Sequence, residues 1–213
     1  MRSKFDEQLA LLNRDLTKMG SLCEEALALA AKALANADGQ TAAKIAPIDS
    51  EIDQMERTIE SLCLKLLLQQ QPVARDLRQI SAALKMITDM ERIGDQASDI
   101  AEIIGFLNGR IGTDAQYICQ MAVAAMRMVT ESVEAYVKRD VAMAEATIQH
   151  DDVVDDLFLK VKESLIQMIS ANPKDGEYAL DLLMIAKYFE RIGDHATNIA
   201  EWVIFSITGN HPG

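Results

Sequence analysis

The chain has 213 residues, of which 49% are hydrophobic and only 5% aromatic, and its formal net charge is −12. With 10 glycines and 4 prolines among many alanine, leucine, isoleucine and methionine residues, this composition is typical of a helical protein. The excess of acid argues against a nucleic-acid-binding or anionic-membrane surface, which needs a cationic face, and is compatible with binding cations or basic proteins.

The cysteines and the N-terminus indicate where the protein works. Cys23, Cys63 and Cys119 are far apart and odd in number, so we expect core residues rather than a disulfide framework or a thiolate metal site. The N-terminus becomes acidic at Asp6 and Glu7, where a signal peptide would be apolar. No uncharged apolar run reaches the roughly 18 residues of a membrane span. We therefore expect a soluble, cytoplasmic protein.

Apolar residues spaced alternately by four and three positions predict three long helices in the first half of the chain. The first helix is expected to end at the turn signal Asp38-Gly39. In the second helix, Pro47 either begins the helix or bends its first turns. Pro72 ends the second helix, and a third helix is predicted over residues 73–107.

The same order of helices recurs in the second half of the chain. Thr113-Asp114 is predicted to cap a helix that continues to about Arg139. The next helix is predicted over residues 141–171 and is closed by Asn172-Pro173, and the last helix extends to about Thr208.

We therefore predict an all-α protein of six long helices that form two sequence-related, antiparallel three-helix bundles. The first bundle is assigned to residues 1–109 and the second to residues 110–213. No flexible linker separates the halves, so a long two-lobed molecule is expected rather than two independent domains.

One short sequence occurs twice, with a constant offset of 99 residues: ERIGDQASDIAE at 91–102 and ERIGDHATNIAE at 190–201. The first copy has acids at i, i+4, i+8 and i+11, and Asn198 replaces the third acid in the second copy. On a helix this spacing places carboxylates along one side. Glycine inside a helix costs about 1 kcal/mol relative to alanine, so Gly94 and Gly193 predict close approach of a neighbouring helix.

An antiparallel hairpin about each proline brings further carboxylates to the height of these motifs. Asp53 lies 19 residues before Pro72, and Glu91 lies 19 residues after it. In the second half, the matching distances from Pro173 differ by one residue, which is about 1.5 Å along a helix. The sequence therefore predicts two clusters of four carboxylates, namely Asp49, Asp53, Glu91 and Asp95, and Asp151, Asp155, Glu190 and Asp194.

Four converging carboxylates repel one another unless a positive charge lies among them. One hypothesis is a hard metal ion such as Mg²⁺, Mn²⁺, Ca²⁺ or iron, with Asp99 extending the first site and Asn198 the second. The alternative is two solvated acidic faces, neutralised by Arg92 and Arg191. The Glu-x-x-His pair of ferritin-like di-iron oxidases is missing, and His195 is left outside the predicted site.

These residues resemble the paired acidic motifs of the PhoU family, regulatory proteins of phosphate transport. The resemblance rests on two ERIGD segments, each preceded by an Asp-x-x-x-Asp pair, and it covers nearly the whole chain. It implies a regulator that is often dimeric and represses phosphate-starvation signalling by contacting the phosphate ABC transporter, chiefly its ATPase subunit, and a sensor histidine kinase. It also implies divalent or trivalent metal ions such as iron, manganese or magnesium on the motif positions, which are Asp49, Asp53, Glu91, Asp95, Asp99, Asp151, Asp155, Glu190 and Asp194.

Asn198 departs from the acid of the first copy, so a second metal cluster would differ in nuclearity or affinity. An alternative hypothesis is a carboxylate-bridged metal hydrolase or oxidase, but the chain lacks histidine ligands and a nucleophile–base pair. A third hypothesis is a structural helical protein whose acids form surface salt bridges. At a net charge of −12, direct binding of phosphate is not expected without a cation. Any location at the inner membrane would come through partners rather than through insertion.

Overall fold

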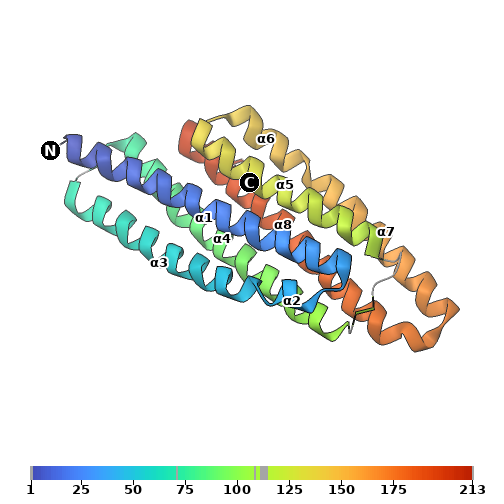
Figure 1. Cartoon of the computed structure of the whole chain (residues 1–213). Helices are drawn as coiled ribbons and strands as arrows, with labels where there is room; N and C mark the ends of the chain where they lie inside the picture. Colours follow the sequence, from blue (N-terminus) through green and yellow to red (C-terminus); the bar gives the residue numbers. More distant parts are fainter. Residues whose placement is uncertain (1, 71, 108, 111–114, 213) are drawn as a thin grey trace.

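The computed structural model describes residues 2–70, 72–107, 109–110 and 115–212, and the predicted cap at Thr113-Asp114 lies outside them. The predicted all-α architecture with six long helices in two repeats is confirmed, and Figure 1 shows the helices side by side in an elongated bundle. The first repeat contains α1 (Arg2–Asn36), α3 (Ile45–Gln70) and α4 (Ala74–Phe106). The second contains α5 (Gln116–Lys138), α6 (Val141–Gln149), α7 (Asp151–Ala171) and α8 (Gly176–Thr208).

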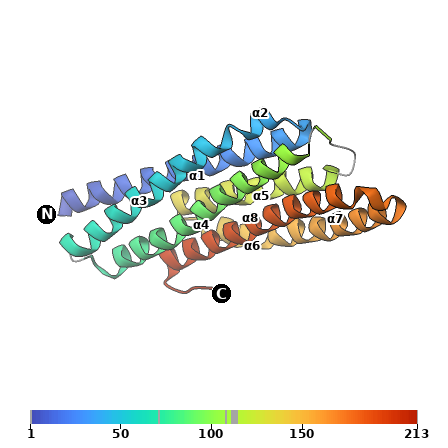
Figure 2. The ribbon, with the colours of Figure 1, turned by 90° about the horizontal axis from the view of Figure 1, so that it is seen from below.

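The two repeats share one apolar core. Residues from both halves, such as Leu16, Met90 and Phe189, are fully buried in the same cluster. The two helices that carry the repeated motif, α4 and α8, pack against each other in the middle of the molecule (Figure 2). α1 also packs against α5, where Cγ1 of Val133 lies 2.8 Å from the position that a Cβ on Gly20 would occupy. The repeats therefore form one continuous body rather than two lobes.

The helix predicted over residues 141–171 is interrupted at His150, which separates α6 from α7. The backbone of His150 remains right-handed helical, with φ −69° and ψ −15°, and its N–H is shared between the carbonyls of Ala146 and Thr147. This tightened turn leaves α7 continuing in line with α6 (Figure 1). Nδ1 of His150 lies 2.9 Å from Oε2 of Glu131 on α5. A tertiary contact thus accompanies an interruption that the helical periodicity does not indicate.

The other helix ends follow the capping and turn signals. Asp38 caps the short helix α2 (Gly39–Ala42), which the sequence analysis did not predict, by accepting a hydrogen bond from a backbone N–H. Pro47 lies in the first turn of α3, where its missing N–H removes no helical hydrogen bond. In the second repeat, Asp140 caps α6, and the 3₁₀ helix η2 (Pro173–Asp175) leads into α8.

The cysteines are free, as expected for core residues. Cys23 and Cys63 are buried and Cys119 is partly buried, and burial raises the pKa of all three thiols. Within the described residues, no helix combines the length and the apolar character that crossing a bilayer requires.

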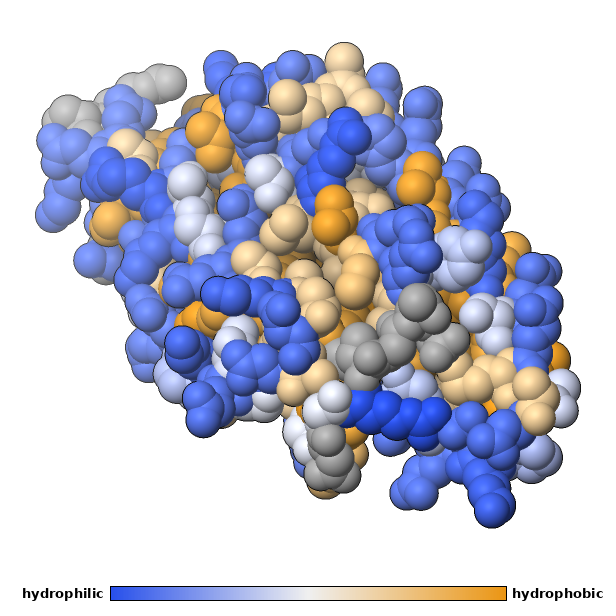
Figure 3. Space-filling model, turned by 45° about the vertical axis from the view of Figure 1, so that its right-hand side comes forward, coloured by the Kyte–Doolittle hydropathy of each residue, from blue (hydrophilic) through white to orange (hydrophobic). Residues whose placement is uncertain are grey.

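The outer helices of the two repeats meet differently. Nζ of Lys18 on α1 lies 2.8 Å from Oε1 of Glu51 on α3, so an ion pair closes this seam in the first repeat. Asp151 lies 102 residues after Asp49, and the same offset places Val153 at the position of Glu51. A groove of about 730 Å³ lies between α5 and α7. Val123 and Val153, on its two walls, are 58% and 50% exposed. Figure 3 views this side of the molecule and shows hydrophobic residues between hydrophilic margins.

Candidate metal centre

Three carboxylates of the first repeat come together where α3 faces α4. One oxygen from each of Asp49, Asp53 and Asp95 lies within 4.8 Å of the other two, and no other set of acidic, histidine or cysteine side chains in the described ranges meets this test. Asp49 and Asp53 are one turn apart on α3, and Asp95 projects from α4. The grouping confirms the antiparallel hairpin predicted from Pro72. The three carboxylates supply the oxygen ligands that hard metal ions prefer.

Asp49 is the member of this triad that has a buried oxygen, Oδ1, without a hydrogen-bond partner. A Cβ on Gly94 would lie 2.8 Å from this oxygen and 3.0 Å from Cδ1 of Ile52, which explains the glycine at this position. Burial is the largest cause that raises the pKa of Asp49, the nearby Ser98 side chain opposes the rise, and the charge of Asp95 adds to it. A buried carboxylate oxygen without a donor fits the role of a metal ligand.

Two arginines lie at the exposed edge of the first cluster. Arg92 approaches Asp95 at 3.2 Å and Glu91 at 3.5 Å. Arg57 approaches Asp53 at 3.5 Å. The side chains of Arg92 and Arg57 are 57% and 65% exposed. Such exposed pairs contribute about 0–1 kcal/mol each. The salt-bridge alternative is thus present at the edge, but neither arginine reaches the buried oxygen of the triad.

Glu91 lies beside the triad rather than within it. Burial is the main cause that raises the pKa of Glu91, and the charge of Asp95 is the next largest. Glu56, one turn beyond Asp53 on α3, also has a raised pKa, because of burial and then the charge of Glu60. The acidic surface therefore continues past the triad along the hairpin of α3 and α4.

The second repeat assembles its acids in a different way. Asp151, Asp155 and Asp194 correspond to the first triad, but among the described residues they do not meet the same distance test. Asp151 still approaches α8 closely, since its Oδ1 lies 3.0 Å from the position of a Cβ on Gly193. Burial, followed by the charge of Asp194, raises the pKa of Asp151 to about 6. The predicted close approach at both motif glycines is therefore confirmed.

A lysine outside the predicted ligand set contacts one acid of the second cluster. Nζ of Lys187 forms a short contact with Oε2 of Glu190 and lies 5.5 Å from the ring centroid of Phe158. The i, i+3 spacing of Lys187 and Glu190 on one helix face was the available signal. The first repeat has Thr88 at the equivalent position, where the hydroxyl donates to the carbonyl of Leu84 on its own helix at 3.5 Å.

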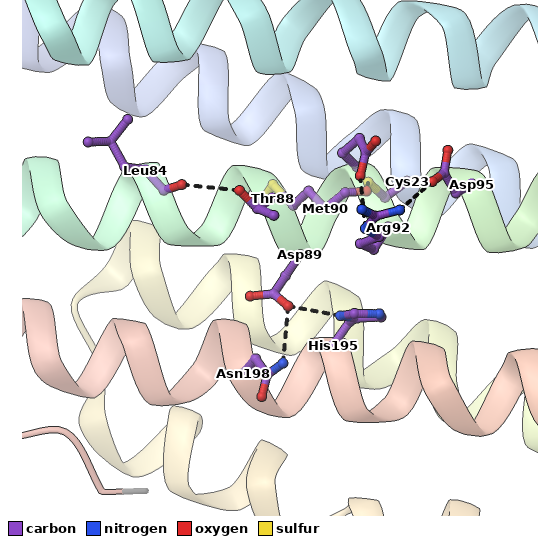
Figure 4. A network of polar contacts seen from close by, with 10 residues as sticks. Cys23, Leu84, Thr88, Asp89, Met90, Arg92, Asp95, His195 and Asn198 are labelled. Atoms are coloured by element: carbon purple, nitrogen blue, oxygen red, sulfur yellow. Dashed lines mark hydrogen bonds and ion pairs between the residues drawn. The ribbon is translucent and has the colours of Figure 1, made fainter.

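Asp99 and Asn198 take part in the contact between α4 and α8. Nδ2 of Asn198 donates to Oδ1 of Asp89 at 3.1 Å, and Nδ1 of His195 lies 2.8 Å from the same oxygen (Figure 4). Burial is the main cause that raises the pKa of Tyr188, and the charge of Asp99 and a hydrogen bond to it contribute. Asp89 and Tyr188 occupy equivalent repeat positions, as do Asp99 and Asn198. Asn198 thus has a partner outside the predicted ligand set.

Comparisons with known proteins agree with this duplicated architecture. A model of the PhoU domain matches residues 16–104 and again residues 118–203. A phosphate-specific transport system accessory protein PhoU homolog of Clostridium acetobutylicum is 37% identical, over 98% of this chain and 96% of that protein. The homolog of Pseudomonas aeruginosa is 33% identical, over 97% of this chain and 86% of that protein.

Solved structures show the same fold. The crystal structure of PhoU from Pseudomonas aeruginosa superimposes with a TM-score of 0.93 at 33% identity and covers 97% of this chain and 100% of that one. The phosphate transport system regulatory protein PhoU from Streptococcus pneumoniae gives a TM-score of 0.89 at 25% identity and covers 98% and 99% of the two chains.

Proposed function

The chain belongs to the PhoU family of accessory proteins of phosphate transport, and from this membership we propose that it acts as a metal-dependent regulatory adaptor. In this role it negatively regulates phosphate uptake and phosphate-starvation signalling. Its partners are the phosphate ABC transporter, through the ATPase subunit, and a sensor histidine kinase. It acts as a homodimer in the cytoplasm and reaches the membrane through these partners. Because the family is regulatory rather than enzymatic, the metalloenzyme hypothesis is set aside.

The observation that carries the metal dependence is the buried, unpaired oxygen of Asp49 beside Asp53 and Asp95. Oxygen-only donors fit hard cations such as Mg²⁺, Mn²⁺ or iron. A bound ion would neutralise three converging negative charges, two from α3 and one from α4. The relative position of these two helices, and hence the surface they present to a partner, would then depend on metal.

The adaptor role is tested by capturing the transporter ATPase subunit on the immobilised protein, with Mn²⁺ or with EDTA. The wild-type protein is expected to capture the subunit in Mn²⁺ and to release it in EDTA. The double variant Asp53→Asn with Asp95→Asn is expected to capture it in neither condition. The matched control is Asp152→Asn with Asp156→Asn, which changes two exposed aspartates one turn apart on α7 and is expected to behave as the wild type.

Capture that is equally strong in EDTA, or equally strong with the triad variant, contradicts the metal dependence. The regulatory role is tested separately in cells by deleting the gene and following a phosphate-responsive reporter. We expect the reporter to become active at high phosphate in the deletion strain. An unchanged reporter contradicts the regulatory role.

A further inference from the structure

We infer that Lys187 is a built-in counter-cation of the second carboxylate cluster, so that the first repeat takes a metal ion and the second repeat does not. This inference rests on the proposed function, because it concerns which of the two predicted clusters binds the metal. Lys187 thereby becomes the residue that determines where a metal ion binds.

The position of Lys187 differs from that of the arginines around the first cluster. Lys187 is 38% exposed and its partner Glu190 is 15% exposed, whereas Arg92 and Arg57 are 57% and 65% exposed. The ammonium group also lies 5.5 Å from the ring centroid of Phe158, an aromatic contact that favours a cation at this place. Lys187 is therefore less exposed than the arginines and is held between Glu190 on α8 and the ring of Phe158 on α7.

The charge of Lys187 extends to a second carboxylate of the cluster. It opposes the rise in the pKa of Asp194 that burial and the charge of Glu190 produce. The ammonium group thus interacts favourably with acids of both motif positions on α8. A divalent cation entering between α7 and α8 would have to displace this group or bind beside it, and like charges at short distance repel.

The first repeat has a different set of residues around its acids. Thr88, at the position of Lys187, is uncharged and bonds to its own helix. Arg57 lies at the exposed edge in the first repeat. The second repeat has Leu159 at the corresponding position, 102 residues later, as Asp151 is from Asp49. Arg92 has an equivalent in Arg191, so the repeats differ in one cation, which is Arg57 on α3 in the first and Lys187 on α8 in the second. In agreement with this difference, the first triad is the only set of acids among the described residues whose ligand oxygens lie within 4.8 Å of one another.

The inference is tested on the full chain by giving each repeat the residue of the other, with the variants Lys187→Thr and Thr88→Lys. Mn²⁺ binding is measured by calorimetry, and electron paramagnetic resonance of free Mn²⁺ gives the stoichiometry. Wild-type protein is expected to show tight binding at the first repeat alone, and Lys187→Thr is expected to add a second class of tight sites. Thr88→Lys is expected to weaken the first site at least about tenfold, since it places an ammonium group beside Glu91. Circular dichroism checks that each variant is folded.

Lys162→Thr is the matched control, because Lys162 also lies over the ring of Phe158, at 5.1 Å, but forms no ion pair with any carboxylate of the described residues. This variant is expected to bind Mn²⁺ as the wild type does. Two equally tight classes of site in the wild type, one lost in Asp53→Asn and the other in Asp194→Asn, overturn the inference and leave the proposed function standing. If Lys187→Thr adds no metal site, the inference is likewise overturned and the proposed function stands. Absence of tight binding in the wild type overturns the metal dependence of the proposed function itself.

Discussion

The two carboxylate clusters have the same acidic pattern but different electrostatic surroundings. In the first, a buried oxygen of Asp49 has no partner, and the arginines lie at the exposed edge. In the second, Lys187 forms an ion pair with Glu190 and lies over the ring of Phe158. The difference arises at a position three residues before the repeated motif, where one repeat has Thr88 and the other a lysine. The capacity of an acidic motif to bind a cation therefore depends on neighbours that the motif does not include.

The largest expected difference between the clusters is in metal affinity. Asp53→Asn with Asp95→Asn removes two negative ligands from the first cluster, so we expect Mn²⁺ affinity to fall at least about 100-fold. The equivalent pair, Asp155→Asn with Asp194→Asn, is expected to leave tight binding unchanged within about twofold. Isothermal calorimetry on both double variants measures this difference. Equal losses in the two variants would show that the clusters bind metal alike.

A smaller effect is expected from alanine substitution of the two motif glycines, which should lower the stability of the protein by different amounts. A Cβ at Gly94 meets Asp49 Oδ1 at 2.8 Å and Ile52 Cδ1 at 3.0 Å, so Gly94→Ala is expected to destabilise the metal-free protein by about 2 kcal/mol. At Gly193 the closest atom is Asp151 Oδ1 at 3.0 Å, and the next lies at 3.5 Å. The gain of about 1 kcal/mol in helix propensity then offsets most of the strain in Gly193→Ala. Urea unfolding with EDTA present compares them, and a larger loss at Gly193 contradicts this explanation.

The pH dependence of stability is expected to reflect Asp151. Its pKa in the folded protein is raised to about 6, whereas an unfolded aspartate titrates near about 3.9. The folded state therefore binds the proton more tightly, and this contribution to stability is present below about pH 4 and is lost as the pH rises through about 6.

Asp151→Asn removes this effect. Because Asp151 is only partly buried, solvent screening reduces the expected gain to about 1 kcal/mol near pH 7. Urea midpoints across this pH range are expected to change less in the variant than in the wild type. Asp152→Asn, an exposed neighbour, serves as the control and is expected to leave the wild-type pH dependence in place. A variant with an unchanged pH profile would assign the dependence to other groups.

The smallest effect is expected at the edge of the first cluster. Arg57→Leu introduces the residue that the second repeat has at this position, Leu159. Because the pair with Asp53 is 3.5 Å long and the arginine is 65% exposed, its loss is expected to change stability by less than about 0.5 kcal/mol. Thermal unfolding measures this change, and a larger loss would mean that the edge arginines hold the cluster together.

Much of the architecture was predictable because local signals determine it. Counting from Pro72 placed α3 and α4 in the correct register, since both arms are regular helices and rise by the same amount per residue. The motif glycines correctly predicted close approach, since a glycine inside a helix needs a structural reason. The boundary between residues 109 and 110 stays a prediction, and the PhoU domain matches lie on either side of it.

The features that were not predicted depend on contacts between distant residues. Asp89 contacts His195 and Asn198 only because α4 and α8 pack together. The sequence repeat does not indicate this contact, since the position equivalent to Asp89 is Tyr188. The interruption at His150 likewise accompanies a contact with Glu131 on α5. The role of Lys187 requires knowing that α7 places Phe158 beneath its ammonium group. Periodicity describes one helix at a time and cannot supply such contacts.

The claim that only the first repeat binds a metal ion is tested most directly by anomalous diffraction from crystals of the wild-type protein grown with Mn²⁺. The density would be measured at the manganese absorption edge, where bound ions are located individually. We predict a peak among Asp49, Asp53 and Asp95, and no peak among Asp151, Asp155 and Asp194. Peaks of equal height at both clusters would contradict the inequality between the repeats, and a peak at the second cluster alone would reverse it.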